Sequence, residues 1–226
     1  MAITDYSALV FDCDGVLLDS NRVKTDAFRQ TALPFGEAAA QALVDYHVSR
    51  GGVSRYAKFR HFLDEIAPQH APGLGGPDLR KIGLEDLLAA YADAVQTGLM
   101  ACAVTPGLAE LRRATPGIPW LIVSGGDQAE LRRVFARRDL DSYFDGGIFG
   151  SPDTKDAILG REFGSGRLSH PALFLGDSRY DHIAAGRAGL DFVFISGWSE
   201  MPAWQDYLAA HGLDSVERVA DLLNAA

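Results

Sequence analysis

The segment Tyr6–Ser20, with the sequence YSALVFDCDGVLLDS, decides the fold of this chain. It opens with an apolar run, Tyr6–Phe11, and passes directly into Asp12-Cys13-Asp14-Gly15. A short continuous apolar run is typical of a strand that is covered on both faces, as in a parallel sheet. In an open parallel sheet, ligands bind beyond the carboxyl ends of the strands. The segment therefore predicts a buried strand that delivers carboxylates to the functional edge of a sheet.

Further apolar runs predict more strands of the same sheet, at Pro119–Val123, Gly147–Phe149, Ala172–Leu175 and Phe192–Ile195. Helical patterns lie between and beside them, at Pro106–Arg113, Asp127–Arg137, Asp153–Phe163 and Tyr180–Ala188. Alternating strands and helices predict an α/β fold with a doubly wound parallel sheet.

The long interval between the first strand and Pro106 contains no convincing strand. It carries helical patterns and a Pro/Gly-rich loop, namely Arg22–Leu33, Glu37–His47, Arg55–Ile66, the loop Pro68–Pro77, and Leu84–Gly98. These could be extra helices packed on the sheet or a separate helical subdomain. We favour the subdomain because a direct crossover normally needs only one helix. The expected division is a core of residues 1–18 and 101–226 with a helical insert of residues 19–100.

The composition narrows the class of protein. Of 226 residues, 47% are hydrophobic and 23% are charged, which is ordinary for a globular protein. The net charge of −9 disfavours nucleic acid and anionic membrane as partners. Two cysteines are too few for a disulfide framework. With no signal-peptide pattern and no membrane-length apolar run, a cytoplasmic location is expected. The oligomeric state is left open.

Polar residues follow three of the expected strands. Asp12 and Asp14 follow the first, Ser124-Gly125-Gly126 follows the second, and Gly176-Asp177-Ser178 follows the fourth, with Asp181 four residues beyond Asp177. Any one cluster could be an ordinary strand-to-helix turn with helix capping. Three clusters at one sheet edge indicate a site.

Four aspartates in one cleft repel one another. A hard cation with oxygen ligands would relieve that repulsion, and Mg²⁺ fits because it binds carboxylates, substrate phosphate and water. Lys155 can supply further positive charge, although alone it would be an ordinary solvated lysine at a helix start.

Such a site suits phosphoryl transfer, which needs positioning, a metal and hydrogen-bond donors for the phosphoryl oxygens. Asp12 is expected to be the nucleophile and to form an aspartyl-phosphate. Asp14 is expected to protonate the leaving oxygen and then to activate water. The hydroxyl of Ser124 is expected to donate to the phosphoryl group from the start of a helix, whose N-terminus favours an anion.

The stretch Phe11–Ser20 resembles the first motif of the haloacid dehalogenase (HAD) superfamily. Ser124, Lys155 and the segment Gly176–Asp181 occur in the order of its second, third and fourth motifs. The resemblance implies a Rossmann-like core with an inserted α-helical cap. It also implies Mg²⁺ held by the Asp12 carboxylate, the Asp14 carbonyl and the Asp177 carboxylate, with Asp181 in support. One departure is Asp156, where related phosphatases often have proline after the lysine.

Two features bear on the substrate. Family dehalogenases lack the second aspartate of the first motif, so Asp14 favours phosphate chemistry. In the expected cap, three residues form a basic cluster, Arg50, Arg55 and Lys58. This cluster is either a solvated helix face or a binding site for a second anionic or polyhydroxyl group of the substrate. Gly125, in the core, is expected beside the substrate. Because Gly52–Arg55 resembles the cap loop of β-phosphoglucomutase-like members, a mutase stays an alternative.

The preferred hypothesis is a Mg²⁺-dependent phosphatase of a small phosphorylated metabolite. A sugar phosphomutase is the first alternative. A non-catalytic binding module of the same fold is the second, and it is disfavoured because every candidate catalytic residue is retained.

Overall fold

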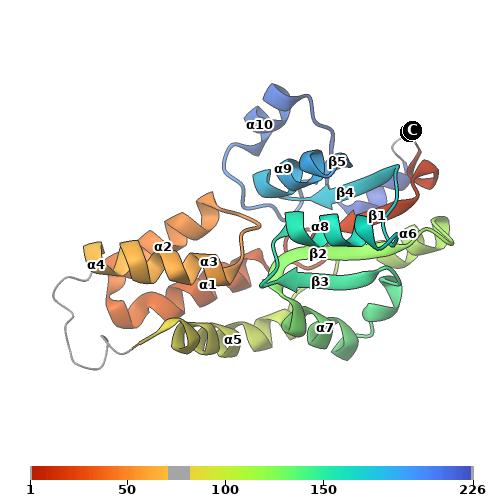
Figure 1. The fold of residues 1–226 in the computed structure, drawn as a ribbon. Helices are drawn as coiled ribbons and strands as arrows, with labels where there is room; N and C mark the ends of the chain where they lie inside the picture. Colours follow the sequence, from red (N-terminus) through yellow and green to blue (C-terminus); the bar gives the residue numbers. More distant parts are fainter. Residues whose placement is uncertain (1, 71–81, 225–226) are drawn as a thin grey trace.

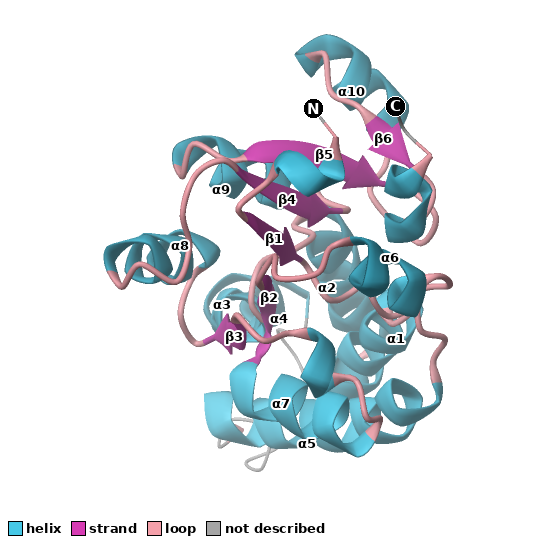
Figure 2. Cartoon of the chain, turned by 90° about the vertical axis from the view of Figure 1, so that its right-hand side faces the viewer, coloured by secondary structure: helices cyan, strands magenta, loops and turns pink. Residues whose placement is uncertain are grey.

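The computed structural model describes residues 2–70 and 82–224. Its centre is a six-stranded parallel sheet in the order β3-β2-β1-β4-β5-β6 (Figures 1 and 2). The strands are β1 (Ala8–Phe11), β2 (Trp120–Asp127), β3 (Gly147–Ser151), β4 (Ala172–Gly176), β5 (Asp191–Ile195) and β6 (Ser215–Val216). The expected α/β class and doubly wound parallel sheet are confirmed.

Side chains of β1 alternate between two apolar layers, as the pleat of a strand requires. Leu9 and Phe11 pack in the layer that contains residues of α6 (Leu108–Ala114) and α7 (Gln128–Arg137). Ala8 and Val10 pack in the opposite layer, with residues of α8 (Lys155–Gly164) and α9 (Arg179–Arg187). Figure 2 shows α8 and α9 on one side of the sheet and α6 on the other. Both faces are therefore covered, which explains the continuous apolar run of β1.

The helices between β1 and α6 lie beyond one end of the sheet (Figure 1). They are α1 (Asn21–Ala32), α2 (Glu37–Ser49), α3 (Arg55–His61), α4 (Ala67–His70) and α5 (Leu84–Ala101), and are called the inserted helices below. Among the described residues of this interval there is no strand, as expected. The expected helix Arg55–Ile66 is divided, because a π-helical turn over Phe62–Ile66 joins α3 to α4. Of the expected loop Pro68–Pro77, Pro68–His70 is helical and residues 71–77 lie outside the described residues.

The two connections between the inserted helices and the sheet run side by side. The N–H of Asp19 donates to the carbonyl of Ala103, and the N–H of Thr105 donates to the carbonyl of Leu17. An isolated bridge also joins Leu18 to Val104. The inserted helices are thus joined to the sheet through one narrow, hydrogen-bonded pair of segments.

Two elements depart from the sequence expectations. The strand expected to end at Val123 continues to Asp127, with an irregular register between Val123 and Asp127 against β3. The sixth strand, two residues long, and the helix α10 (Trp204–His211) before it were not expected.

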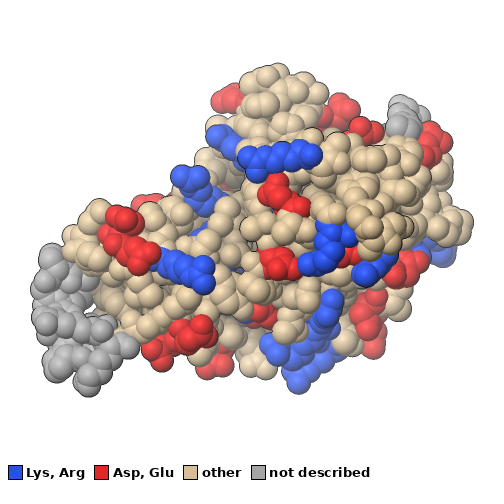
Figure 3. Space-filling model, in the orientation of Figure 1, with Lys and Arg blue, Asp and Glu red and all other residues tan. Residues whose placement is uncertain are grey.

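Acidic and basic side chains are interspersed on the face drawn in Figure 3. No helix among the described residues is long and apolar enough to cross a bilayer.

Candidate active site

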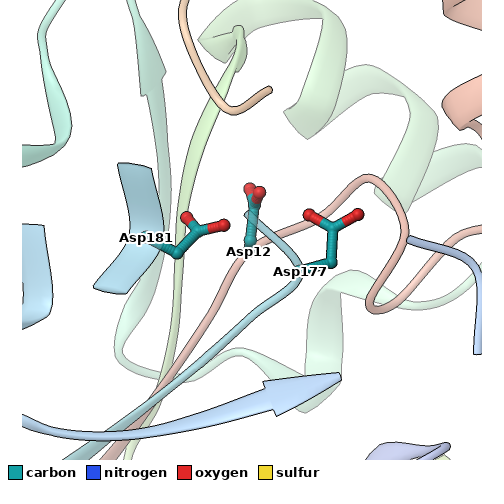
Figure 4. A group of neighbouring side chains, drawn as sticks. All are labelled: Asp12, Asp177 and Asp181. Atoms are coloured by element: carbon teal, nitrogen blue, oxygen red, sulfur yellow. The ribbon is translucent and has the colours of Figure 1, made fainter. Parts of the chain in front are cut away.

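Three carboxylates converge where β1 and β4 end. Asp12 follows β1 directly, Asp177 follows β4 directly, and Asp181 lies in the first turn of α9. One oxygen of each lies within 4.8 Å of the others, and Figure 4 shows Asp12 between its two neighbours. All three side chains are buried. The parallel register of β1 against β4 brings these residues together, because it aligns the carboxyl ends of the two strands.

Lys155 neutralises part of this charge. It is the first residue of α8, capped by the hydroxyl of Thr154, and its side chain is almost completely buried. Its Nζ lies 3.0 Å from Oδ2 of Asp12 and also donates to Asp181. Burial would lower the pKa of Lys155, but Asp12 and Asp181 outweigh it and raise the pKa, so the lysine stays charged. The expected position of Lys155 at a helix start is confirmed.

Asp14 is held by two groups from the beginning of the inserted helices. The Ser20 hydroxyl donates to Oδ1 at 2.6 Å, and Nζ of Lys24 lies 2.5 Å from Oδ2. Burial alone would raise the pKa of Asp14, but Lys24 and the Ser20 hydrogen bond lower it overall. Asp14 is therefore a carboxylate in this arrangement, with Lys24 as its counter-ion.

Asp177 has a different environment, because no lysine or arginine pairs with it among the described residues. Its side chain accepts a hydrogen bond from the amide of Asn21, at 2.8 Å. Burial, followed by the charges of Asp12 and Asp181, raises the pKa of Asp177 well above its usual range. Burial, followed by the charges of Asp181 and Asp14, raises the pKa of Asp12 to about 6 although Lys155 opposes them.

These groups fit a divalent cation. When all four carboxyl groups (Asp12, Asp14, Asp177 and Asp181) are ionised, they face two ammonium groups (Lys24 and Lys155), and two negative charges stay uncompensated within the cluster. The donors are all oxygens, which hard cations prefer. Gly15 leaves room for Asp177, since a Cβ at this position, where φ is +76°, would overlap the Asp177 carboxylate.

Ser124 does not open a helix, so that expectation is wrong. It lies inside β2, fully buried, and its hydroxyl accepts from the N–H of Gly126 at 3.0 Å. Helix α7 begins only at Gln128, where Asp127 is the cap, because β2 extends further than expected. The wall of the cavity at this point is formed by Gly125 and Gly126.

A cavity of about 680 Å³ joins the carboxylates to the inserted helices. It is lined by Asp12, Asp14 and Asp177, by the expected substrate residues Arg50, Arg55, Lys58 and Gly125, and by residues of α1 and α2. Its volume is in the range of small-molecule sites. The loop before α3 packs directly on the core here, since a Cβ at Gly125 would overlap the carbonyl oxygen of Gly52.

The three basic residues expected at the substrate differ in their partners. The Arg55 guanidinium contacts the core helix α7, with Nη1 2.8 Å from Oε2 of Glu130. Lys58 is buried beside His47. Arg50 is exposed and lies over the ring of Tyr46. The basic cluster is therefore not a continuous solvated helix face.

Sequence reasoning missed Asn21, Lys24 and His47. Asn21, Lys24 and Phe28 recur at helical spacing on α1, and all three line the cavity. That spacing, directly after the first motif, is the signal that could have identified Asn21 and Lys24. His47 has no such signal, because its contact with Lys58 depends on the packing of α2 against α3.

Comparison with known structures returns the same fold. A predicted phosphoglycolate phosphatase from Haemophilus somnus matches with a TM-score of 0.73 at 18% identity over 99% of both chains. A predicted phosphatase from Clostridium acetobutylicum gives 0.72 at 19% identity over 97% of both chains. A proposed β-phosphoglucomutase from Thermotoga maritima gives 0.63 at 19% identity over 96% of this chain and 97% of that one. No curated protein matches this chain.

A family comparison matches residues 6–189 to haloacid dehalogenase-like hydrolases. This span contains β1 to β4 and every carboxylate of the site. The chain belongs to the haloacid dehalogenase-like hydrolase family.

Proposed function

We propose that this hydrolase is a Mg²⁺-dependent phosphatase that acts on a small phosphorylated metabolite through an aspartyl-phosphate on Asp12. The observation that carries the proposal is the position of Asp12. Its carboxylate lines the cavity and lies 3.0 Å from Nζ of Lys155. Asp177 lies beside it and has no basic partner in the part of the chain that the structure describes. Asp12 and Asp177, the proposed nucleophile and a proposed metal ligand, thus share one wall of a cavity of metabolite size, and Lys155 pairs with Asp12.

The Asp12 and Asp177 carboxylates and the Asp14 carbonyl would hold the ion, with Asp181 fixed in support by Lys155 and Ser178. When bound, Mg²⁺ would neutralise the carboxylates and the negative charge on the phosphoryl oxygens. Lys155 would add its charge beside Asp12. The backbone at Gly125 and Gly126 lines the same cavity and would face the phosphoryl group.

Asp14 would carry the protons. Its carboxylate form, stabilised by Lys24 and Ser20, is the form that can accept a proton from water in the second step. Protonation of the leaving oxygen in the first step needs the acid form. We expect substrate entry to loosen the Lys24 contact and so to raise the pKa of Asp14. The inserted helices would act as a cap (residues 19–100) that excludes water while the chemistry proceeds.

The test is a screen of phosphorylated metabolites and an aryl phosphate for phosphate release, with Mg²⁺ and with chelator. Asp12→Asn should keep the fold and abolish release, because an amide does not attack phosphorus. Asp14→Asn should slow turnover and accumulate a covalent phosphate on Asp12, detectable as a mass increase. Phosphate release by Asp12→Asn at the wild-type rate, or full activity in chelator, would refute the proposal.

The same screen separates the alternatives. A phosphomutase would move the phosphoryl group between positions of a sugar phosphate with little free phosphate released. The fold shared with the Thermotoga maritima protein is compatible with either outcome. A non-catalytic module would bind phosphorylated compounds without turning over any of them.

A further inference from the structure

A buried lysine lies in the part of the cavity wall that the inserted helices form. Lys58, on α3, is 1% exposed, and its Nζ lies 2.7 Å from Nδ1 of His47 on α2. The same nitrogen lies 5.5 Å from the ring centre of Phe28 on α1. Lys58, His47 and Phe28 all line the cavity that contains Asp12.

Lys58 differs from the other basic groups buried around this cavity. Lys24 pairs with Asp14, Lys155 with Asp12 and Asp181, and Arg55 with Glu130. Among residues 2–70 and 82–224, no carboxylate lies within ion-pair distance of Lys58; its hydrogen-bond partner is the imidazole of His47. A buried amine without a counter-ion is costly in its charged form.

The charges around Lys58 agree with this geometry. Burial and the ammonium groups of Lys24 and Lys155 lower its pKa, Asp14 and Asp12 oppose them, and the result is about 7. Burial, Lys58 and Lys24 hold the pKa of His47 well below its usual range, so the imidazole is neutral. An anion at Nζ would supply the missing counter-charge and return the lysine to its ammonium form.

We propose that Lys58 and His47 bind a second anionic group of the substrate, so that the substrate is a phosphomonoester with a carboxylate or a second phosphate at its other end. This inference rests on the proposed phosphatase function, because it places the reacting phosphoryl group at Asp12. Lys58 offers N–H donors and no acceptor in its charged form. His47, whose Nδ1 accepts from Lys58, carries its proton on Nε2 and offers a second donor.

The surroundings favour an anion over a neutral hydroxyl group. Phe28 and the buried Tyr91 lie in the same wall, and low-polarity neighbours strengthen a charge-assisted hydrogen bond. The volume of about 680 Å³ leaves room for a carbon chain between the two anionic ends. Occupancy of this site requires a protonated lysine, so binding near neutral pH takes up a proton.

The experiment compares matched probes with one and two anionic ends. Phosphate release is measured for ω-phosphonooxy alkanoates of two to six carbons, for α,ω-alkanediol bisphosphates, and for n-alkyl phosphates of the same lengths. At the optimal length, the wild-type kcat/KM should be about ten- to hundredfold higher for one of the two series with a second anionic end than for the alkyl series. The series with the larger increase in kcat/KM over the alkyl phosphates identifies the second anionic group as a carboxylate or a phosphate.

Lys58→Met should reduce that ratio to near one, mainly through KM, and His47→Gln should reduce it partly. Arg60→Met is the matched control, since Arg60 lies on the exposed side of the same helix, and it should keep the ratio. A second readout is calorimetric titration of the Asp12→Asn protein with the preferred probe, in two buffers of different ionisation enthalpy near pH 7. The binding enthalpy should differ between the two buffers because the complex takes up a proton. This difference should disappear in the Asp12→Asn/Lys58→Met protein.

The outcomes separate the two proposals. If no probe in any series is hydrolysed, the phosphatase function fails. If all are hydrolysed with equal kcat/KM, or if Lys58→Met keeps the wild-type ratio, the phosphatase function stands and this inference is overturned. Loss of a buried amine should not lower the melting temperature. If Lys58→Met nevertheless does not fold, an unchanged ratio in His47→Gln overturns the inference.

Discussion

The contact between Arg55 and Glu130 links the inserted helices to the core, and it makes a quantitative prediction. Arg55 lies at the start of α3 and Glu130 in the first turn of α7, with side chains only 10% and 4% exposed. Removing one partner of a buried ion pair costs about 3–5 kcal/mol, because the other charge stays buried without a counter-ion. Two atoms of this pair, Arg55 Nε and Glu130 Oε1, have no hydrogen-bond partner among the described residues, which favours the lower figure, about 3 kcal/mol.

Since the pair joins the two parts of the molecule, we expect this loss to weaken the packing of α3 on α7. An energy of ~3 kcal/mol corresponds to roughly a hundredfold change in an equilibrium constant. Arg55→Met should therefore lower kcat/KM by up to about a hundredfold. The loss should be similar for an aryl phosphate and for a larger natural substrate, because the proposed closure of the inserted helices would serve both.

The assay is a double-mutant cycle in kcat/KM and in thermal unfolding. Glu130→Leu alone should also be harmful, but less so than Arg55→Met, because Asp127 remains 3.7 Å from the Arg55 guanidinium. The double variant should recover most of the loss, because an apolar pair of similar volume replaces the ion pair. Additive losses in the cycle would refute the pairing. A loss confined to the larger substrate would show instead that Arg55 binds the substrate.

Three further predictions concern the metal, the cap loop and Lys58. Mg²⁺ should raise the melting temperature of the wild type, because the ion would relieve repulsion among Asp12, Asp177 and Asp181, and Asp177→Asn should reduce that shift. Thermal unfolding with Mg²⁺ and with chelator measures the shift. An equal shift in Asp177→Asn would contradict the metal site. Gly125→Ala should lower kcat/KM at least tenfold, because its Cβ would meet the Gly52 carbonyl, whereas Gly160→Ala, at a helical position with open space, should not. In the folded protein the pKa of Lys58 is lowered from 10.5 to about 7. Between pH 7 and 10.5 the unfolded state therefore binds more protons than the folded state, so the contribution of Lys58 to the free energy of unfolding increases with pH. Subtracting the unfolding free energy of Lys58→Met from that of the wild type at several pH values should show the increase; a flat difference would disprove it.

The sheet could be predicted because its strands carry their own signal. β1 and β4 are buried on both faces, so every residue in them is apolar or small, and the acidic residues stand where the apolar run stops. β6 carries no such signal, since it has two residues at the edge of the sheet and Ser215 is exposed. The end of β2 was misplaced because Ser124, Gly125 and Gly126 are typical turn residues, whereas here they continue an irregular strand.

The positions of the site residues followed from strand order, but their partners did not. Asp12 and Asp177 meet because parallel strands end at one edge, which is a property of the topology. Arg55 and Glu130 are 75 residues apart in sequence, and their contact depends on how the start of α3 meets the start of α7 in the folded chain. A basic residue near the start of a helix is usually solvated, so the burial of Lys24 and Lys58 depends on neighbours that no local pattern specifies.

The position of β1 in the middle of the sheet has a consequence for biosynthesis. Its two neighbours are β2 and β4, and β4 lies about 160 residues further along the chain. At ~5–20 residues per second, a ribosome needs roughly ten to thirty seconds to reach β4 after making β1. During that time the apolar first strand has no complete sheet to join, while the inserted helices can form local contacts as they emerge. We therefore expect nascent chains that end before β4 to depend on chaperones, and the emergence of β4 from the ribosome to mark the point at which Asp12 becomes fixed in place.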